Sequence, residues 1–270
     1  MKSPIIISFK PAAELSPTEI ADCYALIART GFPFPPGYLE SAHLVHNPTM
    51  VLAHLDGVLV GIQSYSLYKI KTPFRRRNIP FLYGGIGFQD MTAAGQGIAH
   101  HMSARYMRFA LGPFWMIRSY VFLFRTPNPK LIQLMGLQHR LYLPNNNRLT
   151  QPLVQFAQDF VRKERSIQYP IDDRLVVLPP DEERTQTDIT EQWPLLYRSS
   201  KTSYNQLAFD LNLIGQANGR RYLMGNYLLV LGQSSRIQLL KAAWKLGRRW
   251  VKKQLGSPAR KPKLVLSEPI

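Results

Sequence analysis

The stretch from Gly85 to Met102 constrains the fold more than any other part of the sequence. It opens within the apolar run Ile79–Phe88, crosses a loop of small residues and enters a helical pattern from Gln96 to Leu111. The first N–H groups of a helix have no partner inside the helix, and the helix dipole places partial positive charge there. Because Gly95 and Gly97 carry no side chain, an anion can approach these donors. Strand, glycine loop and helix in this order therefore predict an anion-binding site.

Two common phosphate-binding motifs do not fit this loop. A Walker loop requires Lys followed by Ser or Thr, and the chain has Ile98-Ala99 there. The dinucleotide fingerprint follows the first strand of a βαβ unit, whereas a helix and a hairpin are predicted before this loop. The segment Ala94-Gly-Gln-Gly-Ile-Ala99 instead resembles the pyrophosphate loop of the GNAT superfamily of acyl-CoA N-acyltransferases, Arg/Gln-x-x-Gly-x-Gly/Ala. Gly97 and Ala99 match its small positions, and Ala94 replaces its Arg or Gln. The alternative is a tight loop before a buried helix.

The elements predicted before the loop agree with this resemblance. Ser16-Pro-Thr-Glu19 is a capping box that starts a helix ending near Thr30. Asp56-Gly57 between two apolar runs predicts a β-hairpin. The predicted elements are a strand at Ile5–Phe9, a helical piece at Tyr38–Val45, and strands at Met50–Leu55, Val58–Tyr68 and Ile79–Phe88.

Glycines at positions 84, 85 and 87 interrupt the strand that leads into the loop. Glycine weakens a strand, and its usual reasons there are a bulge, a ligand against the backbone, or close packing with a neighbouring side chain. A further strand is predicted at Trp115–Phe124, and a right-handed crossover through the helix would place it parallel to Ile79–Phe88. The resemblance implies that these two strands separate at the glycines and that the pantetheine arm binds in the gap.

The resemblance covers roughly residues 1–145 and implies a set of site residues. Asn128 of the Asn-Pro segment would contact the cofactor, and Met135 stands where the family often has a Tyr acting as general acid. Since Met cannot donate a proton, Tyr83 and Tyr142 are the candidate catalytic residues. The implied contacts to acyl-CoA come from Phe88, Gln89, Gly95, Gln96, Gly97, Ile98, Ala99 and Asn128.

Residues 146–235 are predicted to complete the same domain. The patterns predict helices at Gln151–Arg165, Asp188–Ser199 and Tyr204–Ile214, a strand at Arg174–Leu178, and a strand pair or one bulged strand at Arg221–Leu231 around Gly225-Asn226.

The C-terminal end is strongly basic. The chain carries a formal net charge of +17, and Leu211 to Ser267 contains no Asp or Glu. Within it, Arg236–Leu255 has the pattern of a cationic amphipathic helix with Trp244 and Trp250 on its apolar side. This favours peripheral attachment to anionic lipid over nucleic-acid binding; the alternative is a helix packed on the domain with a solvated basic face. Residues 236–270 are therefore predicted as a separate basic helix and tail.

Several classes of protein are disfavoured. A single cysteine, Cys23, excludes an internal disulfide and a cysteine-based zinc site. His43-x-x-His46 has a metal-like spacing without an evident third ligand, so no metal is expected. The chain has no apolar run long enough for a signal peptide or a transmembrane helix, which favours a cytoplasmic protein.

The sequence thus predicts an α/β fold with a GNAT-like mixed sheet flanked by helices and a C-terminal extension. The predicted function is transfer of an acyl group from an acyl-CoA, or from an acyl carrier protein, to an amine. The alternative is a catalytically weak GNAT-like module that binds anionic membrane or RNA.

Overall fold

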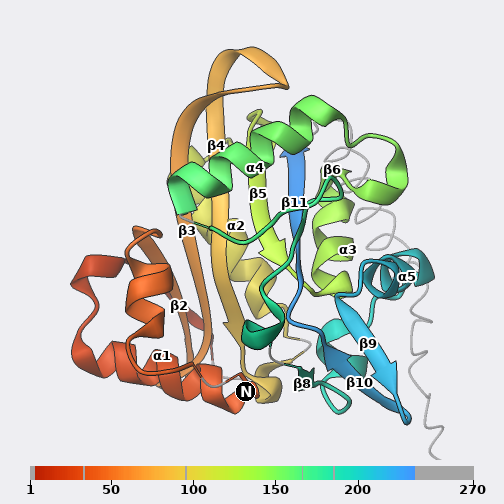
Figure 1. The fold of residues 1–270 in the computed structure, drawn as a ribbon. Helices are drawn as coiled ribbons and strands as arrows, with labels where there is room; N and C mark the ends of the chain where they lie inside the picture. The colour runs from red at the N-terminus through yellow and green to blue at the C-terminus, as the bar shows by residue number, and fades with distance from the viewer. Residues whose placement is uncertain (1–3, 33, 95, 166, 185, 235–270) are drawn as a thin grey trace, which may run out of the picture.

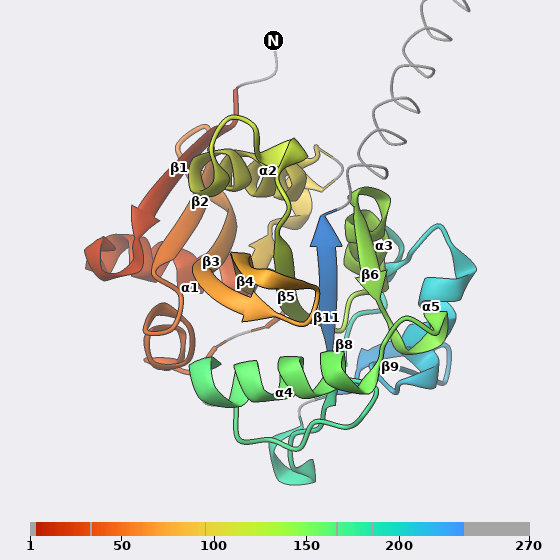
Figure 2. The ribbon, with the colours of Figure 1, turned by 90° about the horizontal axis from the view of Figure 1, so that it is seen from above.

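The computed structural model describes residues 4–32, 34–94, 96–165, 167–184 and 186–234. They build a mixed β-sheet covered by helices on both faces (Figure 1, Figure 2). The main sheet has the strand order β1-β2-β3-β4-β5-β11-β6, and β7 (Val176–Val177) also pairs with β11. Its strands are β1 (Ile6–Pro11), β2 (Thr49–Leu55), β3 (Val58–Thr72), β4 (Arg75–Gln89), β5 (Val121–Thr126), β11 (Tyr227–Ser234) and β6 (His139–Tyr142).

Helices cover the sheet in two layers. One face carries α1 (Pro17–Arg29) and α4 (Gln151–Arg165), and the other carries α2 (Ile98–Leu111) and α3 (Pro129–Gln138) (Figure 2). A small second sheet, β8 (Thr187–Asp188), β10 (Arg220–Leu223) and β9 (Ile214–Ala217), lies beside α5 (Thr202–Asp210). This α/β architecture is the one that the GNAT resemblance implies.

The predicted hairpin and N-terminal helix are confirmed. Asp56 and Gly57 both have positive φ, 52° and 79°, as a tight turn between β2 and β3 requires. Ser16 and Glu19 form the reciprocal hydrogen bonds of a capping box at the start of α1. The helical piece predicted at residues 38–45 is a short π-helical turn, Glu40–Leu44.

The parallel pair β4 and β5 separates in the middle of β4. Their pairing runs from Phe81↔Val121 to Gly84↔Phe124 and stops there, although β4 continues to Gln89. On its other side β4 has a register irregularity against β3 between Gln63 and Tyr65. The predicted separation of the two strands at the glycines is therefore confirmed, and within the described part of the chain β4 has no partner strand on the β5 side beyond Gly84.

Two of the three glycines in β4 are also required by close packing. A Cβ on Gly84 would lie 3.2 Å from Cβ of Phe124. A Cβ on Gly85 would collide with the side chains of Ser64 and Asn47. Packing against neighbouring side chains therefore explains Gly84 and Gly85 without a ligand, whereas Gly87 has ordinary space around it.

Several boundaries predicted from the sequence are wrong. The strand predicted at residues 115–124 begins only at Val121, because Gly112-Pro113 ends α2 and residues 115–117 form a short 3-10 turn. The helix predicted at residues 188–199 is reduced to a π-helical turn, Trp193–Tyr197. Helix α5 ends at Asp210 rather than near Ile214, and only Val176–Val177 of residues 174–178 form a strand.

The two strands predicted on either side of Gly225-Asn226 are confirmed, but they do not pair with each other. Strand β10 belongs to the small sheet, whereas β11 pairs with both β5 and β6 of the main sheet. Gly225 has a φ of 76°, and the buried Asn226 donates a hydrogen bond from Nδ2 to the carbonyl of Asn212 at 3.0 Å. These two residues turn the chain from one sheet into the other. The division into a core and an extension stays a prediction.

A substitution at Gly232 should destabilise the sheet. Gly232 pairs with Phe122 across β11 and β5, and an added Cβ would overlap the Phe122 ring. We expect Gly232→Ala to lower the free energy of unfolding by about 1–3 kcal/mol in chemical denaturation, since overpacking forces side chains from their rotamers. Gly87→Ala is the control, because its Cβ would meet only Cγ of Gln63, at 3.8 Å. A Gly232→Ala chain as stable as the control would contradict this account.

No helix among the described residues is long and apolar enough to cross a membrane. The cationic helix predicted at residues 236–255 and the tail that follows lie outside the described residues.

Candidate functional site

The N-terminus of α2 is open to an anion. Gly97 is the N-cap, with φ 73° and ψ 16°, a left-handed conformation that favours glycine. No side chain caps this helix. The first hydrogen bond of the helix runs from the N–H of His101 to the carbonyl of Gly97 at 3.0 Å, so the N–H groups of Ile98, Ala99 and His100 come before it. Gly95 lies outside the described residues.

Two glutamines hold the loop and the helix against the sheet. Gln89 donates from Nε2 to the carbonyl of Ala93 at 2.7 Å, and Gln63 donates to the carbonyl of Ala99 at 3.1 Å. Ile98 is fully buried, whereas Gln96 is exposed. The side chains of Gln89 and Ile98 therefore hold the loop in position and are not free to bind a ligand. The hydrogen-bond donors that a ligand could use are backbone N–H groups at the start of α2.

Asp90 does not leave an uncompensated negative charge near this loop. Its carboxylate accepts a hydrogen bond from Arg29 Nε at 2.8 Å and bonds from the backbone and hydroxyl of Thr92. Burial alone would raise the pKa of Asp90, but the bonds from Arg29 and Thr92 outweigh it and hold the pKa below its usual value. The ion pair also connects α1 to the end of β4.

Two other predicted cofactor contacts have structural roles in this chain. The Phe88 ring packs with Phe32 and Phe34, at 6.2 and 5.6 Å between ring centroids, in the core beneath α1. Asn128 caps α3 by accepting from the N–H groups of Lys130 and Leu131, and its amide donates to the carbonyl of Leu196. Contacts of these two residues with a cofactor stay predictions. Any such contact by Phe88 would come from its backbone, because its ring packs in the core.

The two candidate tyrosines lie on one row of the sheet but far apart. Tyr83 pairs with Leu123, Leu123 with Leu231, and Leu231 with Tyr142. Three strand spacings separate them by roughly 14 Å. Tyr83 is buried next to the strand separation, whereas the Tyr142 hydroxyl donates to Gln233 at 3.2 Å. They cannot act together on one bond, and the catalytic role of either stays a prediction.

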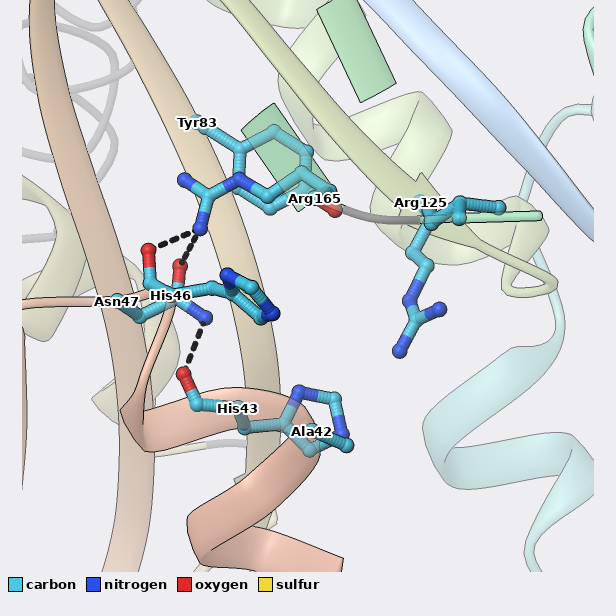
Figure 3. Close-up of a pocket in the computed structure, with 9 residues that line it drawn as sticks. Ala42, His43, His46, Asn47, Tyr83, Arg125 and Arg165 are labelled. Atoms are coloured by element: carbon cyan, nitrogen blue, oxygen red, sulfur yellow. Dashed lines mark hydrogen bonds between the residues drawn. The ribbon is translucent and has the colours of Figure 1, made fainter. Parts of the chain in front are cut away.

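A cavity lies beside the strand separation, on the face opposite α2. Successive residues of β3 point to opposite faces of the sheet. Gly61 lies against Ile98 and Met102 of α2, whereas Ile62 packs on the other face, in the core beneath α1. The cavity has a volume of about 20 Å³, room for a water molecule. It is lined by Ala42, His43, His46, Asn47, Tyr83, Gly85, Arg125, Arg165 and Ile167 (Figure 3).

Arg125 and Arg165 were not predicted from the sequence. An arginine in the apolar run Val121–Thr126 was an available signal for Arg125. Arg165 ends a helix whose last turn also holds Arg162 and Lys163, so nothing in the local sequence distinguishes it. No group of three or more His, Cys, Asp or Glu in the described part of the chain could hold a metal ion.

No protein-family profile matches the sequence, and no curated protein matches it. Among solved structures, the chain is similar to an aminoglycoside N-acetyltransferase in complex with CoA (18% identity, TM-score 0.31, 41% of this chain and 72% of that one). It is also similar to an acyl-CoA N-acyltransferase from Pseudomonas aeruginosa (19%, 0.31, 44% and 79%). A third is a GNAT family acetyltransferase from Streptococcus pneumoniae TIGR4 (17%, 0.30, 40% and 70%). Similarity at this level assigns neither substrate nor activity to this chain.

Proposed function

We propose that this protein transfers an acyl group from an acyl-CoA or acyl carrier protein thioester to an amine. The observation that supports this most is the separation of β4 from β5 beyond Gly84, next to the uncapped N-terminus of α2. The separation leaves one edge of β4 without a partner strand, and the helix start offers backbone N–H groups. An acyl-pantetheine chain ending in a pyrophosphate needs both features.

The donor would bind from the α2 face. Its pyrophosphate would accept hydrogen bonds from the N–H groups at the start of α2, where Gly97 leaves the approach open. Its pantetheine amides would pair with the free edge of β4 between Gly85 and Gln89, as an added strand does. The pairing of Asp90 with Arg29 compensates the nearest carboxylate, which favours an anionic donor at this place.

The amine would arrive from the opposite face, beside the cavity at Tyr83 and Gly85. Its nitrogen attacks the thioester carbonyl carbon, the carbon–sulfur bond breaks, and the thiolate takes up a proton. None of the described residues that line the cavity has a carboxylate, so this part of the chain supplies no acidic side chain as a base there. Catalysis would then rest on positioning the amine against the thioester, and Tyr83 lies one residue before Gly84, the last residue of β4 that pairs with β5.

Native mass spectrometry of the protein as purified, followed by calorimetry with CoA and acetyl-CoA, tests the donor. We expect a bound CoA species or an affinity in the micromolar range, on the order of −8 kcal/mol. No copurified thioester and no detectable binding of either compound would contradict the proposal.

Replacing the candidate phenols one at a time should separate their roles. If Tyr83 protonates the leaving thiolate, Tyr83→Phe should lower kcat by roughly 100-fold with little change in KM for the donor. Tyr142→Phe is the matched control, because Tyr142 lies three strands away along the same row and should retain activity within a few-fold. Steady-state release of free CoA measures both variants, and equal activity of the two would remove Tyr83 as a catalytic residue.

From the sequence we separately propose that the protein is cytoplasmic and that its basic C-terminal end holds it at anionic lipid. The absence of acidic residues between Leu211 and Ser267 supports it. Vesicle co-sedimentation at physiological salt tests it, and equal recovery in the supernatant with anionic and neutral vesicles would contradict it.

A further inference from the structure

The cavity at the strand separation is lined by positive and neutral groups only. Four side chains, those of His43, His46, Arg125 and Arg165, approach it from different directions (Figure 3). They come from three separate parts of the chain: the segment before β2, strand β5 and the end of α4. Two of them, Arg125 and Arg165, are cations from distant elements, and their convergence favours an anionic ligand.

Arg165 is buried, and no counter-ion pairs with it in the described part of the chain. The residue is 7% exposed, and its guanidinium lies over the Tyr83 ring with Cζ 3.9 Å from the ring centroid. Nη1 donates to the carbonyl of His46 and to Oδ1 of Asn47. Nε and Nη2 are buried and have no hydrogen-bond partner among the residues that the structure describes. A buried guanidinium that keeps unpaired donors is costly for the fold, and a ligand that accepts from them would offset this cost.

Arg125 adds a second positive charge at the same cavity. It is half-buried, and its guanidinium lies 5.5 Å from the ring centroid of Tyr227. Among the described residues, no Asp or Glu forms an ion pair with Arg125 or Arg165. Two arginines near one cavity without a carboxylate repel each other, and an anion between them would reverse the sign of that interaction.

We propose that the amine acceptor carries a carboxylate, and that Arg165 and Arg125 bind this group. That the ligand is an amine rests on the proposed acyl transfer. That it carries a carboxylate rests on the cavity alone. Arginine suits this role because its planar N–H groups match the two oxygens of a carboxylate. The acceptor is thereby placed among amino acids and other small amino-carboxylates.

The size and place of the cavity favour a small acceptor. With a volume of about 20 Å³, the cavity holds about one water molecule, so only the oxygen atoms of a carboxylate would enter it and the rest of the acceptor would lie outside. It shares Tyr83 and Gly85 with the part of β4 where the pairing to β5 ends. The carboxylate and the attacking nitrogen would therefore be separated by only a few bonds.

Binding of simple anions tests the site independently of activity. The melting temperature of the full chain is measured in increasing sodium acetate, sodium phosphate and sodium chloride at constant ionic strength. We expect a saturable increase with acetate that is lost in Arg165→Gln and in Arg125→Gln. Arg198→Gln, which removes an exposed arginine, should respond as the unmodified chain does. If Arg165→Gln does not fold, the melting temperature of Arg125→Gln in acetate gives the same test, because Arg125 is only half-buried.

Paired amines test the acceptor class. Release of free CoA from acetyl-CoA is measured with glycine against glycinamide, β-alanine against β-alaninamide, and phosphoethanolamine against ethanolamine. We expect each carboxylate to be preferred over its amide by roughly 10- to 100-fold in kcat/KM, and Arg165→Gln to reduce that ratio toward one. Arg165→Lys should retain part of the preference.

The outcomes separate the two proposals. If acetate stabilises the chain through Arg125 and Arg165 but no amine is acylated, the acyl transfer fails and the carboxylate site stands. If amines are acylated with no preference for a carboxylate and acetate has no effect that depends on these arginines, the carboxylate site is overturned. A response to phosphate and phosphoethanolamine alone would also overturn it, because the site would then bind a phosphate.

Discussion

Replacing Gly97 by glutamate is expected to weaken CoA binding by roughly 100-fold or more, about 3 kcal/mol. The new carboxylate would stand at the start of α2, where the pyrophosphate should accept hydrogen bonds, and it would repel that group. The substitution also places a side chain at a φ of 73°. Calorimetric titration of the purified variant with CoA measures the effect.

Two further variants separate charge from backbone strain. Gly97→Ala introduces only the strain of a non-glycine residue at positive φ, which costs about 1–2 kcal/mol of stability, and should keep most of the CoA affinity. Gly219→Glu adds the same charge at a similar φ of 75°, in the turn between β9 and β10. It should bind CoA as the unmodified chain does. Unchanged affinity in Gly97→Glu would mean that the donor does not bind at α2.

Acid should unfold this protein through two buried histidines. Burial lowers the pKa of His139 to about 4, against an opposing hydrogen bond with the carbonyl of Met135. Burial, with a smaller contribution from the charge of Arg125, lowers the pKa of His43 to about 3. Both values lie below the pKa of about 6.5 expected in the unfolded chain. The unfolded state therefore binds more protons below that pH, and stability falls as the pH decreases from about 6.5 toward 4.

Each histidine should contribute roughly 2 kcal/mol to this loss between pH 7.5 and 4.5. Urea unfolding at a series of pH values measures it. His139→Gln should be less stable at neutral pH, because the Tyr120 hydroxyl loses its bond to Nε2 of His139, yet it should show a shallower loss with acid. His101→Gln alters an exposed histidine and should leave the profile unchanged. The same slope in all three proteins would contradict the assignment.

The features that could be predicted from the sequence are those that depend on neighbouring residues. The Asp56-Gly57 turn, the capping box at Ser16 and the glycine start of α2 each depend on the conformational preference of a few neighbouring residues. The separation of β4 from β5 followed from a resemblance whose small residues lie within one stretch of sequence. These features needed no knowledge of which distant segments meet.

The missed features that concern the site and the strand pairing depend on distant contacts. Arg165 reaches the cavity because α4 covers the face of β4 that carries Tyr83, and it is 119 positions from the carbonyl of His46 that it contacts. The pairing of β10 with β9 rather than with β11 was missed for the same reason, since the turn at Gly225-Asn226 reads as a hairpin signal by itself. Asp90 could not be matched to Arg29 by periodicity.

The position of β11 between β5 and β6 has a consequence for how the chain is made. Among the described strands β6 pairs with β11 alone. The paired residues Tyr142 and Leu231 are roughly 90 positions apart in sequence, and such a separation slows folding. As the chain leaves the ribosome, the open edge of β5 has no partner until residues 227–234 have been synthesised. An unpaired strand edge of this kind attracts other chains. The second half of the polypeptide therefore completes the sheet and brings Arg165 to the cavity, and any fragment that stops before Tyr227 carries an exposed edge.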